Sequence, residues 1–230
     1  MAKPLEGVRI LDLSTLLAGP FGSMILADLG ADVIKIELPG REDQSRHMPP
    51  HYVGATSAYF IAFNRNKRSL ALDLKDGEGY GVFLELVKRS DVVYDNFRPG
   101  VLERLRADYE TLRKVNPRII SASVTGYGQT GPDRGKAALD LIIQARGGIM
   151  SFTGEPGRPP VRMGIPMGDM GGGLFAAHGI LAALLQRERT GQGQKVDVSL
   201  LDCQIYLASY RAQYYLTGGE DGGDAHREEA

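Results

Sequence analysis

The sequence predicts an α/β fold in which a mostly parallel sheet carries helices on both faces. Three observations lead to this prediction. Short runs rich in β-branched residues alternate with helical stretches through the first half of the chain, an order typical of parallel strands joined by helical crossovers. Loops rich in glycine, proline or polar residues follow several of these runs. The length of 230 residues allows a substantial core, in one large domain or two.

Five strands are expected in the first half of the chain, at residues 8–13, 31–37, 69–74, 91–94 and 119–124. Helices are expected between them, at residues 21–29, 76–89 and 109–115. Gly30 follows the first helix as a C-terminal glycine does. Apolar residues at helical spacing give the second helix a buried face, and Pro117 stops the third.

The second half of the chain is predicted to be richer in loops. Residues 125–137 and 151–169 are expected to be loops because they carry many glycines and prolines. Helices are expected at 139–146, 172–187 and 200–216, and a strand at 193–198. The glycine-rich, charged residues 218–230 are expected to be disordered or a cut edge. We therefore divide the chain into a large domain, residues 1–200, and a helix with a tail, residues 200–230.

Composition and charge exclude several classes of protein. A net charge of −1 without a basic block gives no electrostatic support for a nucleic-acid partner. No apolar run approaching ~20 residues is found, and the N-terminus lacks the apolar core of a signal peptide, so no membrane partner is expected. Cys203 is the only cysteine, and the four histidines lack metal-ligand spacing, so we expect no disulfide and no metal site. These features are typical of a cytoplasmic protein.

Four loops should meet at the carboxyl edge of the sheet, where α/β proteins bind ligands. They comprise residues 14–20, 38–58, 95–100 and 125–136. Cations gather in residues 64–69 and again at Arg98 and Arg104, which suits a phosphorylated ligand. The first loop lacks the G-x-G-x-x-G pattern of dinucleotide sites, and the P-loop pattern is also missing.

Asp169 stands among glycines directly ahead of the apolar helix expected at 172–187. One interpretation makes it the N-cap of that helix. The other makes it a nucleophile, since the helix N-terminus and the amides of residues 171–173 would keep a carboxylate ionised and support a neighbouring oxyanion. A carboxylate can act as a covalent catalyst on an activated acyl compound.

Seven stretches together resemble the family III CoA-transferases, the CaiB/BaiF group. They run in family order from residue 4 to about residue 203: PLEGVRILDLS, LAGPF, LADLGADVIKIE, FNRNKRSLALDLK, DNFRPGVLERL, ISASVTGYGQTGP and GDMGGGLFAAHGILAALLQRERTGQGQKVDVSLLD. The resemblance implies a Rossmann-like large domain, a smaller second domain, and two interlocked subunits that form a homodimer.

The resemblance also implies an activity, the transfer of CoA from an acyl-CoA donor to a carboxylic acid acceptor, with CoA as substrate and no permanently bound cofactor. The active-site aspartate of the family falls on Asp169, which would pass through an anhydride and an aspartyl-CoA thioester. The family's CoA contacts and active-site acid fall on nine further residues: Leu16, Leu17, Ala18, Asn96, Phe97, Arg98, Arg104, Lys136 and Asp140.

Three departures from the family pattern keep alternatives open. Leu17 replaces a polar side chain of the formyl-CoA-using branch, which speaks against oxalate–formate exchange. The 2-methylacyl-CoA racemases of the superfamily need a histidine base before Asp140, and residues 136–139 contain none. Family members reach roughly 400 residues, so the small domain is expected to be absent from this chain. The chain is then a fragment of a transferase, a short form that needs a partner chain, or a non-catalytic CoA-binding or interaction module.

Overall fold

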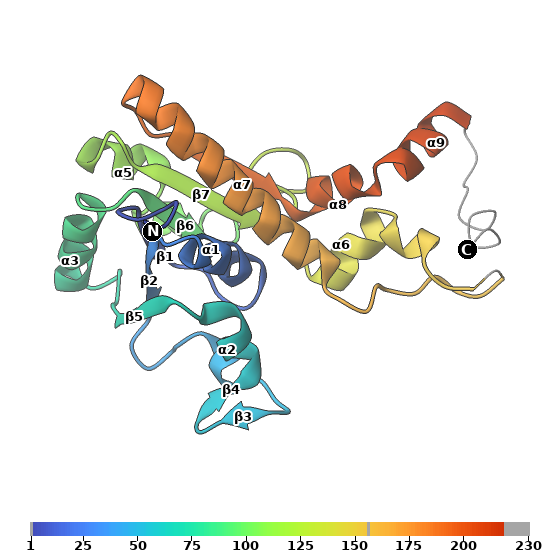
Figure 1. Cartoon of the computed structure of the whole chain (residues 1–230), viewed down its shortest axis with the longest axis horizontal. Coiled ribbons are helices and arrows are strands. Elements are labelled where there is room, and N and C mark those ends of the chain that lie inside the picture. Colours follow the sequence, from blue (N-terminus) through green and yellow to red (C-terminus); the bar gives the residue numbers. More distant parts are fainter. Residues whose placement is uncertain (1, 156, 219–230) are drawn as a thin grey trace.

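A six-stranded parallel sheet forms the centre of the protein. The computed structural model describes residues 2–155 and 157–218 (Figure 1). The strands of the sheet are β1 (Arg9–Asp12), β2 (Asp32–Glu37), β5 (Lys67–Ala71), β6 (Val92–Asp95), β7 (Ile120–Thr125) and β8 (Lys195–Ser199). Their spatial order is β5-β2-β1-β6-β7-β8, and every neighbouring pair is parallel. This is the doubly wound order in which two halves meet between β1 and β6, so the α/β prediction is confirmed.

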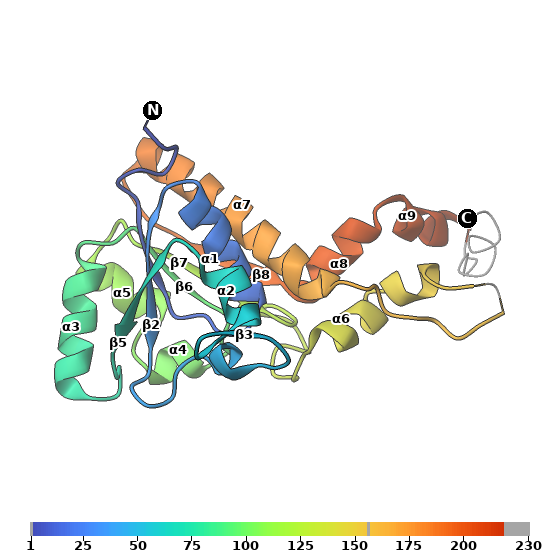
Figure 2. The same ribbon diagram turned by 60° about the horizontal axis from the view of Figure 1, so that its bottom comes forward.

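Helices cover both faces of the sheet. The helices of the described residues are α1 (Ala18–Asp28), α2 (Ala58–Asn64), α3 (Gly77–Val87), α4 (Val101–Arg104), α5 (Tyr109–Val115), α6 (Asp140–Arg146), α7 (Met167–Thr190), α8 (Leu200–Ala208) and α9 (Tyr210–Gly218), with 3-10 turns η1 (Gln44–His47) and η2 (Ile149–Phe152). Helices α1 and α7 pack on one face, and α3, α4 and α5 pack on the other (Figure 2).

Neighbouring strand residues belong to different cores. Ile10 packs with Leu26 and Ile180 under α1 and α7, whereas Leu11 packs with Phe83 and Leu112 under α3 and α5. Successive strand side chains point to opposite faces, and in the central strands β1 and β6 both faces are buried. These strands are therefore short apolar runs, which is why the sequence identified them.

Several predicted boundaries were wrong. Strand β5 begins at Lys67, two residues before the predicted run, because Lys67 already pairs with Val33 of β2. The single helix expected at 200–216 is two helices, α8 and α9, since Ser209 between them adopts a positive φ of 49°. The loop expected at 38–58 contains η1 and a small hairpin, β3 (Tyr52–Val53) with β4 (Thr56–Ser57), and α2 and α4 were not anticipated.

Helix α7 starts at Met167 and ends at Thr190, so it is longer at both ends than the predicted 172–187. Its 24 residues are long and apolar enough to span a bilayer by length and composition alone, contrary to the expectation of no such run. Half of that apolar window is buried inside the protein, as in the core helix of a soluble protein, and α7 lies along α1 and the sheet (Figure 1).

Helices α6, α8 and α9 extend away from the sheet beyond the N-terminal end of α7 (Figures 1 and 2). Of the predicted tail, only Gly218 is described, as the last residue of α9; residues 219–230 lie outside the described residues.

Candidate active site

Asn96 ties together the two loops that meet at the switch point of the sheet. Its side-chain oxygen accepts a hydrogen bond from the Thr15 amide at 2.9 Å, and its side-chain nitrogen donates to the Thr15 carbonyl at 2.8 Å. The loop after β1 and the loop after β6 are therefore fixed to each other. Asn96 was predicted to contact CoA. In the structure its side-chain amide binds both backbone groups of Thr15.

A cavity of about 430 Å³ opens at the carboxyl ends of β1, β2, β5 and β6. Its walls come from the four segments that follow those strands, and its lining residues are Leu13, Thr15, Ile36, Glu37, Leu38, Arg41, Asp43, Leu72, Asp73, Leu74, Lys75, Phe97, Val101, Arg104 and Leu105. Three cations in this wall, Arg41, Lys75 and Arg104, form no ion pair with any described residue. The cavity thus combines an apolar lining with unpaired positive charge, as a phosphorylated ligand requires.

Two of the predicted CoA contacts line this cavity, Phe97 and Arg104. Arg98 is exposed outside it, and Lys136 is also exposed and pairs with Asp133 at 2.7 Å. Leu16, Leu17 and Ala18, which were predicted to line the CoA crevice, form the turn into α1. Leu17 and Ala18 are almost fully buried there. Arg41 and Lys75 were missed, although both follow a predicted strand and carry a charge.

The cations of residues 64–69 serve the fold, which corrects their assignment to a ligand. Arg65 pairs with Asp28, Lys67 with Asp12 and Arg68 with Asp32. The earlier start of β5 places Lys67 and Arg68 within that strand, and none of the three cations lines the cavity.

Asp169 lies in the first turn of α7, as the third residue of the helix. The sequence had suggested that Asp169 is the N-cap or a loop residue ahead of the helix, and in the structure it is neither. Pro166 occupies the cap position and has no side-chain hydrogen bond to offer. Asp140, at the start of α6, supplies the missing acceptor: its Oδ1 atom receives the Gly168 amide at 2.7 Å and the Asp169 amide at 3.2 Å. A carboxylate from another helix thus caps α7.

Two glutamines brace this turn. Gln144 donates to Asp140 at 2.7 Å and accepts from the Met163 amide at 2.9 Å. Gln204, fully buried on α8, donates to the Met167 carbonyl at 3.1 Å. The two side chains hold Asp140 and the first turn of α7 in place.

The glycines after Asp169 allow close packing, and the oxyanion role expected for their amides is wrong. Residues 171–173 lie inside α7, where their amides donate to carbonyls of the preceding turn. A Cβ atom on Gly172 would lie 2.2 Å from Leu200 Cδ2, and one on Gly173 would lie 2.6 Å from the Ala18 carbonyl oxygen. Because Asp169 precedes Gly173 by one helical turn, both share the face of α7 that meets the start of α1.

The pKa of Asp169 is raised to about 7, first by burial and second by the neighbouring charge of Asp140. The sequence had suggested the opposite, a carboxylate kept ionised by helix amides. The physical reason for the difference is that Asp140 already occupies the amides of that turn, and it contributes a like charge instead.

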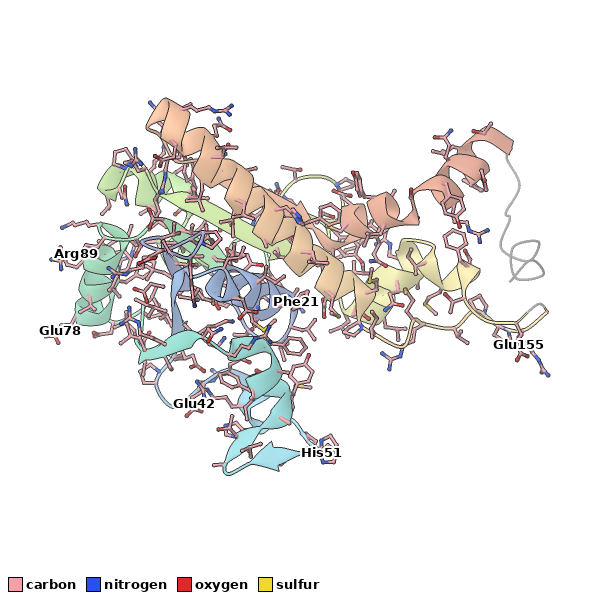
Figure 3. All side chains as sticks on the ribbon, in the orientation of Figure 1. Phe21, Glu42, His51, Glu78, Arg89 and Glu155 are labelled. Carbon is pink, nitrogen blue, oxygen red and sulfur yellow. The ribbon has the colours of Figure 1, made fainter. Side chains whose placement is uncertain are left out.

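Tyr59 of α2 lies within the electrostatic influence of Asp169, and sequence reasoning missed it. Burial, followed by the charges of Asp169, Asp43 and Asp140, raises the pKa of its phenol to about 12. Its ring packs edge-on against Phe63 at 5.2 Å, and Phe63 packs against Phe21 at 6.1 Å. Figure 3 shows Phe21 on α1 beside α2. The three rings form an aromatic cluster between α1 and α2. Helix α2 was missed because its segment has no clear helical periodicity.

Among the described residues, no group of three or more histidine, cysteine, aspartate or glutamate side chains is placed to hold a metal ion.

Comparison with protein-family models gives one match, to the description "CoA-transferase family III", over residues 5–230. Among curated proteins, the chain is 47% identical to the mouse succinyl-CoA:glutarate CoA-transferase over 227 residues, covering 97% of this chain and 52% of that protein. It is 50% identical to the acetyl-CoA:oxalate CoA-transferase of Acetobacter aceti over 218 residues, covering 94% of this chain and 56% of that protein. The chain therefore spans little more than half the length of these relatives.

Among solved structures, a CAIB/BAIF family protein from Brucella suis superposes with a TM-score of 0.92 at 42% identity, over 96% of this chain and 59% of that chain. Rv3272 from Mycobacterium tuberculosis superposes with a TM-score of 0.84 at 36% identity, over 94% and 59% of the respective chains.

Proposed function

The chain belongs to the family III CoA-transferases, and from this membership and the geometry of the site we propose that it moves CoA from an acyl-CoA donor to a carboxylic acid acceptor, with Asp169 as the covalent nucleophile. The observation that carries the proposal is the position of Asp169. Its carboxylate is half-buried in the first turn of α7, where the amides of that turn are capped by a second carboxylate, Asp140.

Covalent transfer proceeds in four balanced steps. The Asp169 carboxylate attacks the donor thioester carbonyl, the C–S bond breaks, and CoA thiolate leaves a mixed anhydride. The thiolate attacks the aspartyl carbonyl, forming an aspartyl-CoA thioester and releasing the donor acid as a carboxylate. The acceptor carboxylate attacks this thioester, giving a second anhydride and CoA thiolate. The thiolate then attacks the acceptor's carbonyl, which releases the new acyl-CoA and the free Asp169 carboxylate.

The cavity offers a place for the nucleotide of CoA. Phe97, Leu72 and Leu74 offer apolar contact to a base, and Arg41, Lys75 and Arg104 offer charge to phosphates. The loop after β1 links the cavity to the nucleophile, because Thr15 lines the cavity and Ala18 packs against Gly173, one turn after Asp169.

The acceptor is proposed to be a dicarboxylic acid. The names of the relatives described above include glutarate and oxalate as acceptors, and both are dicarboxylates. One carboxylate of such an acid attacks the aspartyl thioester while the other remains to be recognised. The acyl donor is proposed to be a short acyl-CoA such as succinyl-CoA or acetyl-CoA.

A partner subunit is part of the proposal as well. Helices α8 and α9 carry large apolar side chains in contact with solvent, among them Tyr206 at 73% exposed and Leu216 at 76%. Such a surface favours association with a second copy or with a chain that supplies the remaining length of the family.

Intact-mass analysis after mixing the protein with succinyl-CoA or acetyl-CoA tests the proposal. We expect a covalent CoA adduct on Asp169 that disappears in Asp169→Asn. Asp202→Asn is the matched control, because Asp202 is likewise an acidic residue in the first turn of a helix, α8, but is exposed. Formation of the adduct in Asp169→Asn, or its loss in Asp202→Asn, would refute the assignment of Asp169.

A further inference from the structure

A buried ion pair lies beneath the loop that enters α1. Lys35 Nζ of β2 is 2.9 Å from Asp43 Oδ2, and the two side chains are 2% and 0% exposed. Buried ion pairs contribute little to stability compared with apolar residues of similar size, because both charges lose their hydration. What the pair touches besides itself is therefore informative.

Both members of the pair bind the backbone of the loop. Lys35 Nζ donates to the Ser14 carbonyl at 2.7 Å. The Asp43 carboxylate accepts from the Leu16 amide, at 3.2 Å to one oxygen and 3.3 Å to the other. Asn96 holds both backbone groups of Thr15, which lies between them. Successive backbone groups of this loop are thus held by side chains from β2, from the cavity wall and from the loop after β6.

The loop is held in a conformation that it would not adopt alone. Leu16 has a φ of +66°, in the left-handed region that residues other than glycine seldom occupy. Such a conformation costs about 1 kcal/mol or more and persists only where surrounding contacts impose it. The hydrogen bond from the Leu16 amide to Asp43 acts directly at this residue.

Asp43 also forms part of the cavity wall. Its Oδ1 atom accepts from the Ser45 amide at 2.9 Å, and its own amide donates to Glu37 at 3.0 Å. One carboxylate therefore sets the conformation of the loop at Leu16 and the position of the cavity wall at residues 37–45.

Asp43 remains charged in this place. Burial alone would raise the pKa of its carboxyl, but the Lys35 charge and hydrogen bonds from Lys35 and Ser45 bring the pKa below its ordinary value. The hydrogen bonds to the loop are consequently charge-assisted, which makes them stronger than neutral ones.

We propose that Lys35 and Asp43 are positioning residues that hold residues 14–17 in the strained shape that receives acyl-CoA between the cavity and Asp169. The proposal rests on the proposed function for the identity of the ligand. It explains why the chain retains two buried charges here: both of them bind the loop, and an apolar pair could not.

Calorimetric titration with CoA as the probe provides the first test. Lys35→Met removes the ammonium while keeping most of the side-chain volume, and we expect it to weaken CoA binding by about tenfold or more. Asp43→Asn, which keeps an oxygen for the Leu16 amide, should weaken binding less and serves if Lys35→Met does not fold.

Arg187→Met is the control for the loss of a largely buried ion pair. Arg187 pairs with Asp91 at 2.8 Å, the two side chains are 6% and 25% exposed, and Asp91 lies just before the amino end of β6, outside the cavity lining. We expect this variant to lose stability yet to bind CoA like the wild type. Equal CoA affinity of Lys35→Met and wild type, or equal weakening by Lys35→Met and Arg187→Met at similar stability, overturns the proposal.

Hydrogen exchange in the ligand-free protein tests separately whether Lys35 and Asp43 hold the loop at residues 14–17. The Thr15 and Leu16 amides should exchange about tenfold faster in Lys35→Met than in wild type, while amides of β7 keep their protection. Unchanged exchange at these two amides overturns the holding role, whether or not CoA binds. If the wild-type chain binds no CoA, the proposed function and the ligand assigned to the loop both fall, and the exchange result alone decides whether the pair fixes the loop.

Discussion

Replacing Asp140 by asparagine is expected to lower the pKa of Asp169. The substitution removes one negative charge but leaves a side-chain oxygen that can still accept from the Gly168 and Asp169 amides. The cap of α7 should therefore survive, while the electrostatic contribution of Asp140 to the pKa of Asp169 disappears.

The size of the effect follows from the geometry. Asp140 Oδ1 is 3.2 Å from the Asp169 amide nitrogen, and we take about 6 Å between the two charges for an order-of-magnitude calculation. Two unit charges at that separation repel by about 3 kcal/mol at an effective dielectric constant of about 20. This corresponds to a pKa change of about 2, and partial exposure of Asp169 reduces it to about 1. Burial, the larger cause, remains, so we expect the pKa of Asp169 to fall from about 7 to about 6.

Carboxyl-carbon NMR of protein labelled at aspartate measures this pKa without reference to any activity. The rate of adduct formation from acyl-CoA provides a second measurement, because only the ionised carboxylate attacks. Its acidic limb should follow the pKa of Asp169 and move to lower pH in Asp140→Asn. An Asp169 that titrates near 4 in the wild type, or a pKa that Asp140→Asn leaves unchanged, would refute the reasoning.

Three further predictions concern stability. The folded-state pKa of Asp169 is raised from 3.8 to about 7. Protonated Asp169 therefore stabilises the fold below pH about 4, and this contribution is lost as the pH rises through 7. In urea unfolding, the wild type should lose about 2–4 kcal/mol of unfolding free energy over that interval relative to Asp169→Asn. Gly173→Ala should destabilise the fold by about 2 kcal/mol, because its Cβ would lie 2.6 Å from the Ala18 carbonyl oxygen. The control Gly81→Ala, on the open face of α3, should stabilise the fold by about 0.5–1 kcal/mol in the same assay. Equal effects of the two substitutions would contradict the close-packing argument. Asn96→Ala should cost about 2 kcal/mol of unfolding free energy and loosen the loop after β1, since Thr15 loses partners for both backbone groups; a neutral substitution would contradict this.

The sheet could be predicted from the sequence because its information is local. Strands β1 and β6, for example, are short apolar runs. Boundaries failed where distant residues decide them. The start of α7 is an example. Glycines and prolines predict a loop at residues 151–169 and a helix only from residue 172, but Asp140 caps the turn at Gly168 from another helix, and close packing against α1 and α8 offsets the low helix propensity of the glycines.

The residues of the candidate site divide in the same way. Asp169, Phe97 and Arg104 were identified because family motifs carry them. Arg41 and Lys75 each follow a predicted strand and carry a charge, but only the meeting of separate segments shows that they line one cavity. No local pattern marks Tyr59. The charges of residues 64–69 show the converse error, since a cluster conspicuous in the sequence turned out to hold the fold.

The raised pKa of Asp169 suits the proposed mechanism better than an amide-stabilised carboxylate would. Attack on a thioester carries negative charge away from Asp169 onto the departing thiolate, and both the anhydride and the aspartyl-CoA thioester are neutral at this residue. Burial and the charge of Asp140 disfavour only the ionised form, so each neutral intermediate relieves the electrostatic penalty that the free carboxylate carries. With a pKa of about 7, a large fraction of Asp169 is still ionised at neutral pH and able to attack. A carboxylate held by several amides would be fully ionised, but it would lose those interactions on forming either intermediate, and its attack would be slower for that reason.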